Sequence, residues 1–171
     1  MPTSEGARLS QTIHRNVEDM KNLCRGVDEE TASRAPAGRW SPKQIISHLW
    51  CPEGTEHAET FSAILEQDTP RLDIEAENPF FSEKRGRMAL SDLLAEFERK
   101  YVRIAALVEG LSEEQLNRKA HIPLLKETPL GEYPTLAGWA QTLGDYHLAM
   151  HIGHMREILE ALEVASGSQT K

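Results

Sequence analysis

The sequence predicts an all-α fold, a four-helix bundle with a long crossover connection. Leucine, alanine, glutamate and arginine are frequent and valine is sparse, a balance that favours helices over strands. Apolar residues recur at helical spacing in four segments, and one long segment between them lacks this spacing. A chain of 171 residues can bury its own core. We therefore expect one domain over residues 1–171, ordered at about 7–164 and flexible at 165–171.

The first and third helices are predicted by their apolar stripes. The first is expected at about residues 7–27, with a stripe made of Leu9, Ile13, Val17, Met20 and Cys24. The third is expected at about residues 91–108, with a stripe made of Leu90, Leu93, Leu94, Phe97, Tyr101, Ile104 and Leu107. Residues 28–39 are predicted to be a loop. Residues 69–88 contain two prolines and little periodicity, so they are expected to form the long connection over the surface.

The second helix has a well-defined start at Ser41. This residue is a natural N-cap, and Gln44 completes a capping box with it. Pro42 occupies the first helical position, where its missing N–H costs nothing. Pro52 and Gly54 follow within the same apolar segment. Because Pro52 cannot donate a hydrogen bond to the preceding turn, we expect a kink or a break there.

The fourth helix is expected at about residues 135–164, and its apolar stripe contains three histidines. At about 100° per residue, the positions on the same side as His147 are Leu136, Ala140, Leu143, Met150, His151, His154, Ile158 and Leu162. Burying an imidazole without a partner is costly. The three histidines could be protonated and paired, exposed at the edge of the stripe, or bound to a metal ion.

The spacing of these histidines limits how many can bind one ion. His147 and His151 are separated by about 6 Å of helical rise, which two side chains can bridge. His151 and His154 could do the same. His147 and His154 are about 10.5 Å apart along the axis, so one of the three is a bystander. A third ligand should come from another helix, and His48, on a partly apolar face, is the best candidate.

Each of these residues also has a plainer structural interpretation. A lone histidine on an apolar face, as His48 is, more often is a satisfied core residue than a ligand. Cys51 is more often a small core residue, although it could face the site. Cys24 and Cys51 form no CxxC pair, so a cysteine zinc site is excluded.

Charge and hydropathy exclude some function classes. The formal net charge of −8 disfavours nucleic acid as a partner, because an acidic surface repels phosphates. No apolar run approaches the ~20 residues that cross a membrane. The N-terminus shows no signal peptide. We therefore expect a cytoplasmic protein that acts on a small molecule, with no nucleic-acid or membrane partner.

Two motifs resemble those of the DinB-like family of four-helix metalloproteins. They are WSPKQIISHL at residues 40–49 and HLAMHIGHM at residues 147–155. This family also contains the bacillithiol- and mycothiol-dependent transferases and the maleylpyruvate isomerases. Its pattern is a tryptophan–serine helix start, a histidine–leucine pair seven or eight residues later, and HxxxH in the last helix. The similarity extends from the first helix to about residue 162.

The resemblance implies a ligand set, a metal and a topology. His48, His147 and His151 would be the metal ligands, with zinc or nickel as the ion. His154 stands where the family usually has glutamine, so it would lie beside the ligands. The implied fold is an up-up-down-down type of bundle with a long crossover, normally a homodimer. Two features depart from the family: the helix break, and an acidic residue after the first histidine that could be Glu53 or Glu56.

Three imidazoles would leave an open coordination position, as in catalytic zinc sites. The sequence therefore favours a metal-dependent enzyme that transfers a low-molecular-weight thiol to an electrophile or hydrolyses a small substrate. Glu56 and His154 are the candidates for a catalytic general base. The alternative is a non-catalytic stress or sensor protein in which the ion is structural. A third hypothesis is that the protein binds no metal and that the histidines form a pH-sensitive core.

Overall fold

The computed structural model describes residues 2–168, and it confirms an all-α four-helix bundle. The long elements are α1 (Ser4–Cys24), α3 (Pro42–Leu49) continued by α4 (His57–Glu66), α6 (Leu90–Glu109), and α8 (Leu136–Gln141) continued by α9 (Leu148–Ser168). The short ones are α2 (Glu29–Ser33), α5 (Glu83–Arg87), α7 (Glu113–Leu116) and a 3₁₀ turn at Pro123–Leu125. The described residues contain no strand, only isolated bridges at Arg71–His121 and Lys119–Thr135.

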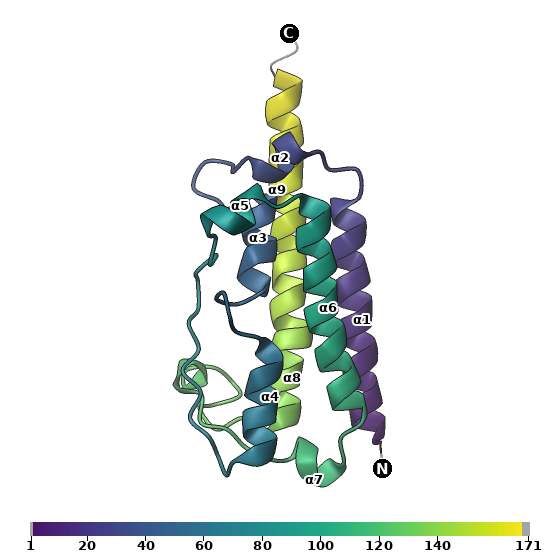
Figure 1. The fold of residues 1–171 in the computed structure, drawn as a ribbon, viewed down its shortest axis with the longest axis vertical. Coiled ribbons are helices and arrows are strands. Elements are labelled where there is room, and N and C mark those ends of the chain that lie inside the picture. The colour runs from purple at the N-terminus through teal and green to yellow at the C-terminus, as the bar shows by residue number, and fades with distance from the viewer. Residues whose placement is uncertain (1, 169–171) are drawn as a thin grey trace.

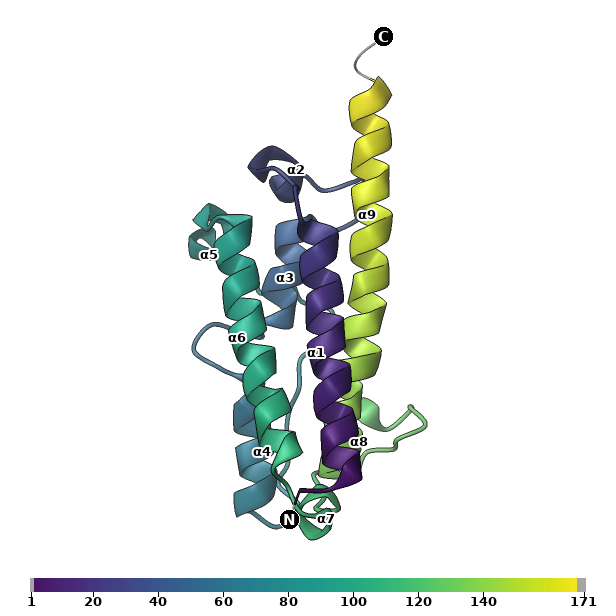
Figure 2. The ribbon, with the colours of Figure 1, turned by 90° about the vertical axis from the view of Figure 1, so that its right-hand side faces the viewer.

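The order of directions differs from the one implied by the resemblance. In Figure 1, α1 ascends, α3 and α4 descend one after the other, α6 descends, and α8 and α9 ascend. The expected up-up-down-down order is therefore wrong, and the order is up-down-down-up. The crossover of residues 69–88 carries the chain from the lower end of α4 to the upper end of α6, as expected (Figure 1). Figure 2 shows α1 lying between α6 and the ascending α8–α9 helix.

The start and the interruption of the second bundle element follow the predicted pattern. Ser41 and Gln44 form a reciprocal capping box, with donor–acceptor distances of 2.7 and 3.2 Å. Helix α3 ends at Leu49 and α4 begins only at His57. Between them Cys51 and Gly54 adopt left-handed backbone conformations, with φ of 64° and 78°. The break confirms the expectation from Pro52 and Gly54.

The last bundle element is not a uniform α-helix. Thr142–His147 is π-helical, and we call it the π segment. A π turn holds about one extra residue, so the buried face beyond it moves by about one position. Leu148 is therefore fully buried, whereas Met150 is 44% exposed. The prediction that Met150 lies in the buried stripe is wrong for this reason.

Other boundaries shift by a few residues. Helix α1 is displaced toward the N-terminus of its predicted range, and the predicted loop at 28–39 contains α2. Helix α9 continues to Ser168, so part of the tail expected to be flexible is helical. The rest of that tail, residues 169–171, lies outside the described residues. None of the described helices is long and apolar enough to cross a membrane.

Candidate metal centre

His48 is fixed by the crossover that lies against it. Its Nδ1 donates a hydrogen bond of 2.6 Å to the carbonyl oxygen of Asn78, since a carbonyl can only accept. This bond assigns the proton to Nδ1 and leaves the lone pair of Nε2 free to bind a metal. His48 Nε2 lies 3.0 Å from His147 Nε2. The crossover therefore does more than cover the surface, because it orients a candidate ligand.

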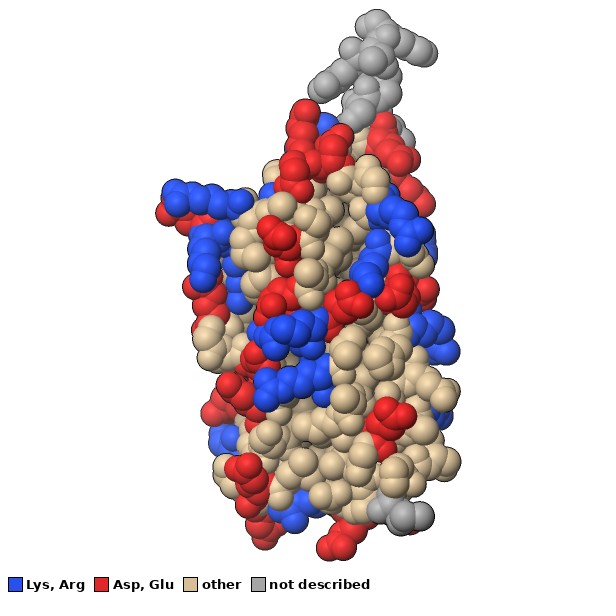
Figure 3. All heavy atoms as spheres, turned by 45° about the vertical axis from the view of Figure 1, so that its right-hand side comes forward, with Lys and Arg blue, Asp and Glu red and all other residues tan. Residues whose placement is uncertain are grey.

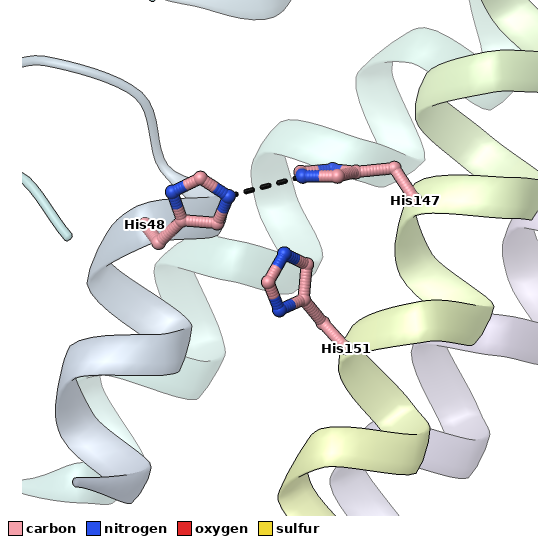
Figure 4. A group of neighbouring side chains, drawn as sticks. All are labelled: His48, His147 and His151. Atoms are coloured by element: carbon pink, nitrogen blue, oxygen red, sulfur yellow. Dashed lines mark hydrogen bonds between the residues drawn. The ribbon is translucent and has the colours of Figure 1, made fainter. Parts of the chain in front are cut away.

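The other two histidines approach from the opposite side. His147 ends the π segment and His151 lies one turn further along, in α9. Figure 4 shows both rings pointing from that helix toward His48. One nitrogen from each of the three rings lies within 4.8 Å of the others. Tetrahedral ligands at about 2.05 Å from zinc are about 3.3 Å apart, so small rotations of these rings suffice to fit one ion.

The unpaired nitrogens of the group fit a metal ion. His151 is only 4% exposed, and neither of its ring nitrogens has a hydrogen-bond partner among the described residues. Nδ1 of His147 is also buried without a partner. Leaving a buried polar atom unpaired costs about 1–3 kcal/mol, so such groups need an explanation. A divalent ion between the rings would pair with one nitrogen of each ring and so account for part of this unpaired set.

The protonation state of the group also suits a metal. Burial lowers the pKa of His147 and of His151 to about 3, and the neighbouring histidines add to the effect. Burial likewise lowers the pKa of His48, although the hydrogen bond to Asn78 opposes the shift. All three rings are therefore neutral at physiological pH. Neutral imidazoles are the form that binds zinc and similar ions.

Two aromatic rings stack on the histidines, and one buried arginine binds the backbone beside them. Trp40 stacks on His151 with an interplanar angle of 9°, and Phe80 stacks on His48 with an angle of 3°. Arg85 is 3% exposed and donates 3.2 Å and 3.1 Å hydrogen bonds to the carbonyl oxygens of Phe80 and Ser47. The two hydrogen bonds from Arg85 connect the crossover to α3. They help to hold in place the backbone next to His48 and Phe80.

Helix α1 supplies no ligand, but it holds the π segment. The side chain of Asn16, 7% exposed, donates a 3.0 Å hydrogen bond to the carbonyl oxygen of Gly144. A π turn leaves carbonyls without their usual helical partner, and this bond satisfies one of them. Gly144 also packs so closely on α1 that a Cβ there would lie 2.3 Å from Cγ1 of Ile13. The position of His147 therefore depends on contacts with α1.

Gly144→Ala should destabilise the protein and weaken metal binding, because the new methyl group pushes α1 away from the π segment. Overpacking of this kind costs about 1–3 kcal/mol. Gly153→Ala is the matched control in the same bundle element, because a Cβ there meets nothing within 4 Å. We expect that control to be neutral or to stabilise the helix by up to about 1 kcal/mol. Urea unfolding and metal titration of both variants test this, and equal behaviour would contradict the role of Gly144.

A cavity opens beside the histidine group. Its volume is about 490 Å³, within the range of small-molecule sites. It lies between the α3–α4 break, the crossover, the 3₁₀ turn and the α8–α9 helix. His48 and His147 form part of its wall, whereas His151 does not. An ion held by the three rings would therefore lie beside this cavity.

The other predicted site residues lie apart from the histidine group. Glu56 lines the cavity, but its carboxylate is paired with Arg99 at 2.8 Å and Arg103 at 2.6 Å. The hydrogen bond from Arg99 lowers the pKa of Glu56, which makes it a weaker base. Its role as a general base stays a prediction. Glu53 is held by Ser82 and Arg85 and does not line the cavity.

His154 and Cys51 lie outside the group of three histidines. The ring of His154 lies 5.3 Å from that of His151, perpendicular to it, and outside the group of three. Cys51 lines the cavity, and burial raises the pKa of its thiol. It is therefore a neutral thiol rather than a nucleophile at neutral pH. Sequence patterns did not indicate Asn78, whose contribution is a backbone carbonyl, or Asn16.

The fold and the histidine group together define a metal-binding four-helix-bundle protein. The chain belongs to the DinB superfamily, whose family model matches residues 12–155. It is also similar to a solved structure described as "YfiT from Bacillus subtilis is a probable metal-dependent hydrolase with an unusual four-helix bundle topology". The two share 19% identity and a TM-score of 0.75 over 95% of this chain and 91% of that one. No curated protein sequence matches the chain significantly.

Proposed function

We propose that this protein is a metal-dependent enzyme that hydrolyses a small molecule, with zinc or nickel held by His48, His147 and His151. The observation that carries the proposal is the cavity into which two of these histidines face. A structural ion would be closed off by protein ligands, whereas a catalytic ion keeps one position open. The description of the similar structure as a probable metal-dependent hydrolase supports hydrolysis as the reaction.

The protein's own residues supply binding and orientation. When bound at such a site, a divalent ion lowers the pKa of a ligated water or thiol and polarises a carbonyl. The apolar wall of the cavity, which includes Trp139 and Leu143, would hold the substrate and exclude water. The stacked rings of Trp40 and Phe80 keep the ligands in place while a substrate enters.

Transfer of a low-molecular-weight thiol to an electrophile is the second candidate reaction. Hydrolysis benefits from a carboxylate that accepts a proton, and Glu56 is engaged with two arginines. A thiol ionises more easily than water, so thiol transfer depends less on such a base. The pairing of Glu56 is the observation that keeps this reaction in consideration.

Turnover assays of the metal-loaded protein test both reactions. Hydrolysis of 4-nitrophenyl acetate is compared with conjugation of 1-chloro-2,4-dinitrobenzene to glutathione or bacillithiol. We expect turnover in one of the two assays, and this turnover should require zinc or nickel. It should disappear in His151→Ala. It should persist in His14→Ala, which changes an exposed histidine of α1. Stoichiometric metal with no metal-dependent turnover in either assay would instead support the non-catalytic stress or sensor function.

We also propose that the protein forms a homodimer. Sedimentation of the metal-loaded protein tests it directly.

On the face shown in Figure 3, neither positive nor negative charge dominates. Basic and acidic side chains are interspersed in a band across the middle, and uncharged residues occupy much of the lower part. This face therefore lacks the concentrated basic surface to which phosphate backbones bind.

A further inference from the structure

The wall of the cavity combines apolar side chains with acidic ones. The apolar part includes Leu72, Ile74, Phe80, Trp139, Leu143 and Met150. The acidic side chains are Glu56, Glu59, Asp73, Glu75 and Glu77. Among the described residues that line the cavity there is no lysine or arginine. The acidic side chains therefore give this wall an excess of formal negative charge over positive among its Asp, Glu, Lys and Arg side chains.

Some of this negative charge is already compensated. Glu56 is paired with Arg99 and Arg103, and Asp73 is paired with Arg71 at 3.0 Å. These acids attract a ligand only weakly, because their charge is shared with a nearby cation.

Among the described residues, three of the acids have no ion pair, and one of these, Glu75, accepts a 2.8 Å hydrogen bond from the side chain of Asn78. Glu59 and Glu77 have no ion pair within 4.0 Å among the described residues. Glu77 adjoins the metal centre, because it directly precedes Asn78, whose carbonyl binds His48. Glu77 and His48 also line the same cavity. A charged ligand group in this cavity would therefore interact with an unpaired carboxylate near the metal centre.

We propose that the cavity selects apolar molecules that carry a cationic group, such as an amine, or no charge, and that Glu77 is the main source of this selection. The proposal deepens the proposed function and rests on it. An anionic molecule of the same shape would bind less well, because its charge would lie near exposed carboxylates that have no cationic partner among the described residues. Selection of this kind comes from repulsion as much as from attraction.

Three matched probes test the selection: benzyl mercaptans with an aminomethyl, a hydroxymethyl or a carboxylate group in the para position. Each has one thiol for the metal and one apolar ring, so the probes differ mainly in charge. Their dissociation constants are measured by calorimetry on protein already loaded with zinc. We expect the ammonium probe to bind on the order of tenfold more tightly than the carboxylate probe, with the neutral probe between them. The ratio should fall when NaCl is raised, because salt screens exposed charges.

Glu77→Gln should reduce that ratio several-fold. The control is Glu114→Gln, an exposed residue of α7 that does not line the cavity. Both variants change the net charge equally, so only a local effect separates them. An unchanged ratio in Glu77→Gln, or equal effects of the two variants, would overturn the role of Glu77.

The remaining outcomes separate this proposal from the proposed function. Equal or tighter binding of the carboxylate probe to zinc-loaded protein overturns the proposal alone. Failure of all three probes to bind zinc-loaded protein overturns the cavity as a ligand site. Failure of the protein to take up zinc, nickel or cobalt overturns the proposed function and this proposal together.

Discussion

His48→Ala, His147→Ala and His151→Ala should each abolish stoichiometric metal binding. The three nitrogens lie within 4.8 Å of one another, and two ligands from one helix make a weak site. Metal content is measured by elemental analysis after loading with zinc or nickel and removal of free ions. His14→Ala should keep the full stoichiometry, because His14 is exposed on α1 and is not one of the three grouped histidines.

The variant His154→Ala tests whether His154 is a metal ligand or only a neighbour of the ligands. Its ring touches that of His151 but lies outside the group of three, so its removal should weaken metal affinity by at most about 10–100-fold. The assignment is wrong if His154→Ala loses the metal while His147→Ala retains it.

Lowering the pH should unfold the metal-free protein more readily. The pKa of His147 and of His151 is about 3 in the folded protein and about 6.5 in an unfolded chain. Between these values the unfolded chain binds more protons, so the free energy of unfolding falls as the pH falls below about 6.5. At pH 5 the loss is about 2 kcal/mol per histidine, or about 4 kcal/mol for the two. That is a large part of the 5–15 kcal/mol typical of a domain. Above about pH 7.5 these groups should have no effect.

Urea unfolding at pH 7.5 and pH 5.0, with and without a chelator, measures this effect. His151→Leu should show a smaller pH dependence, because one of the two groups is gone. At pH 7.5, zinc at about 100 times its dissociation constant should stabilise the wild type by about 2.7 kcal/mol. A free energy of unfolding that stays flat from pH 7.5 to 5.0 in the metal-free protein would show that the imidazoles are not buried in neutral form.

The ligand group was predictable because its signals are local. His147 and His151 are four residues apart in a helical segment, and His48 follows a capping box that the structure contains. Helical spacing alone left open which histidine of the last helix is the bystander. The resemblance to the DinB-like family placed His154 there, and the structure leaves it outside the group.

The features that support the group were not predictable from local patterns. The hydrogen bond from His48 to Asn78 joins residues 30 positions apart through a backbone carbonyl, which any residue type could supply. The π segment arises from packing on α1 and has no propensity signal, so Met150 was assigned to the wrong face. Gly144 lies in the π segment, but Gly138 and Gly153 lie in the same predicted helix, so a glycine alone does not locate it.

A crystal structure of the zinc-loaded protein, with anomalous diffraction recorded at the zinc edge, tests the central claim most directly. We expect one anomalous peak about 2.0–2.1 Å from a ring nitrogen of each of His48, His147 and His151, with its fourth coordination position facing the cavity. A peak elsewhere, or a fourth ligand from the protein that closes this position, would contradict the account.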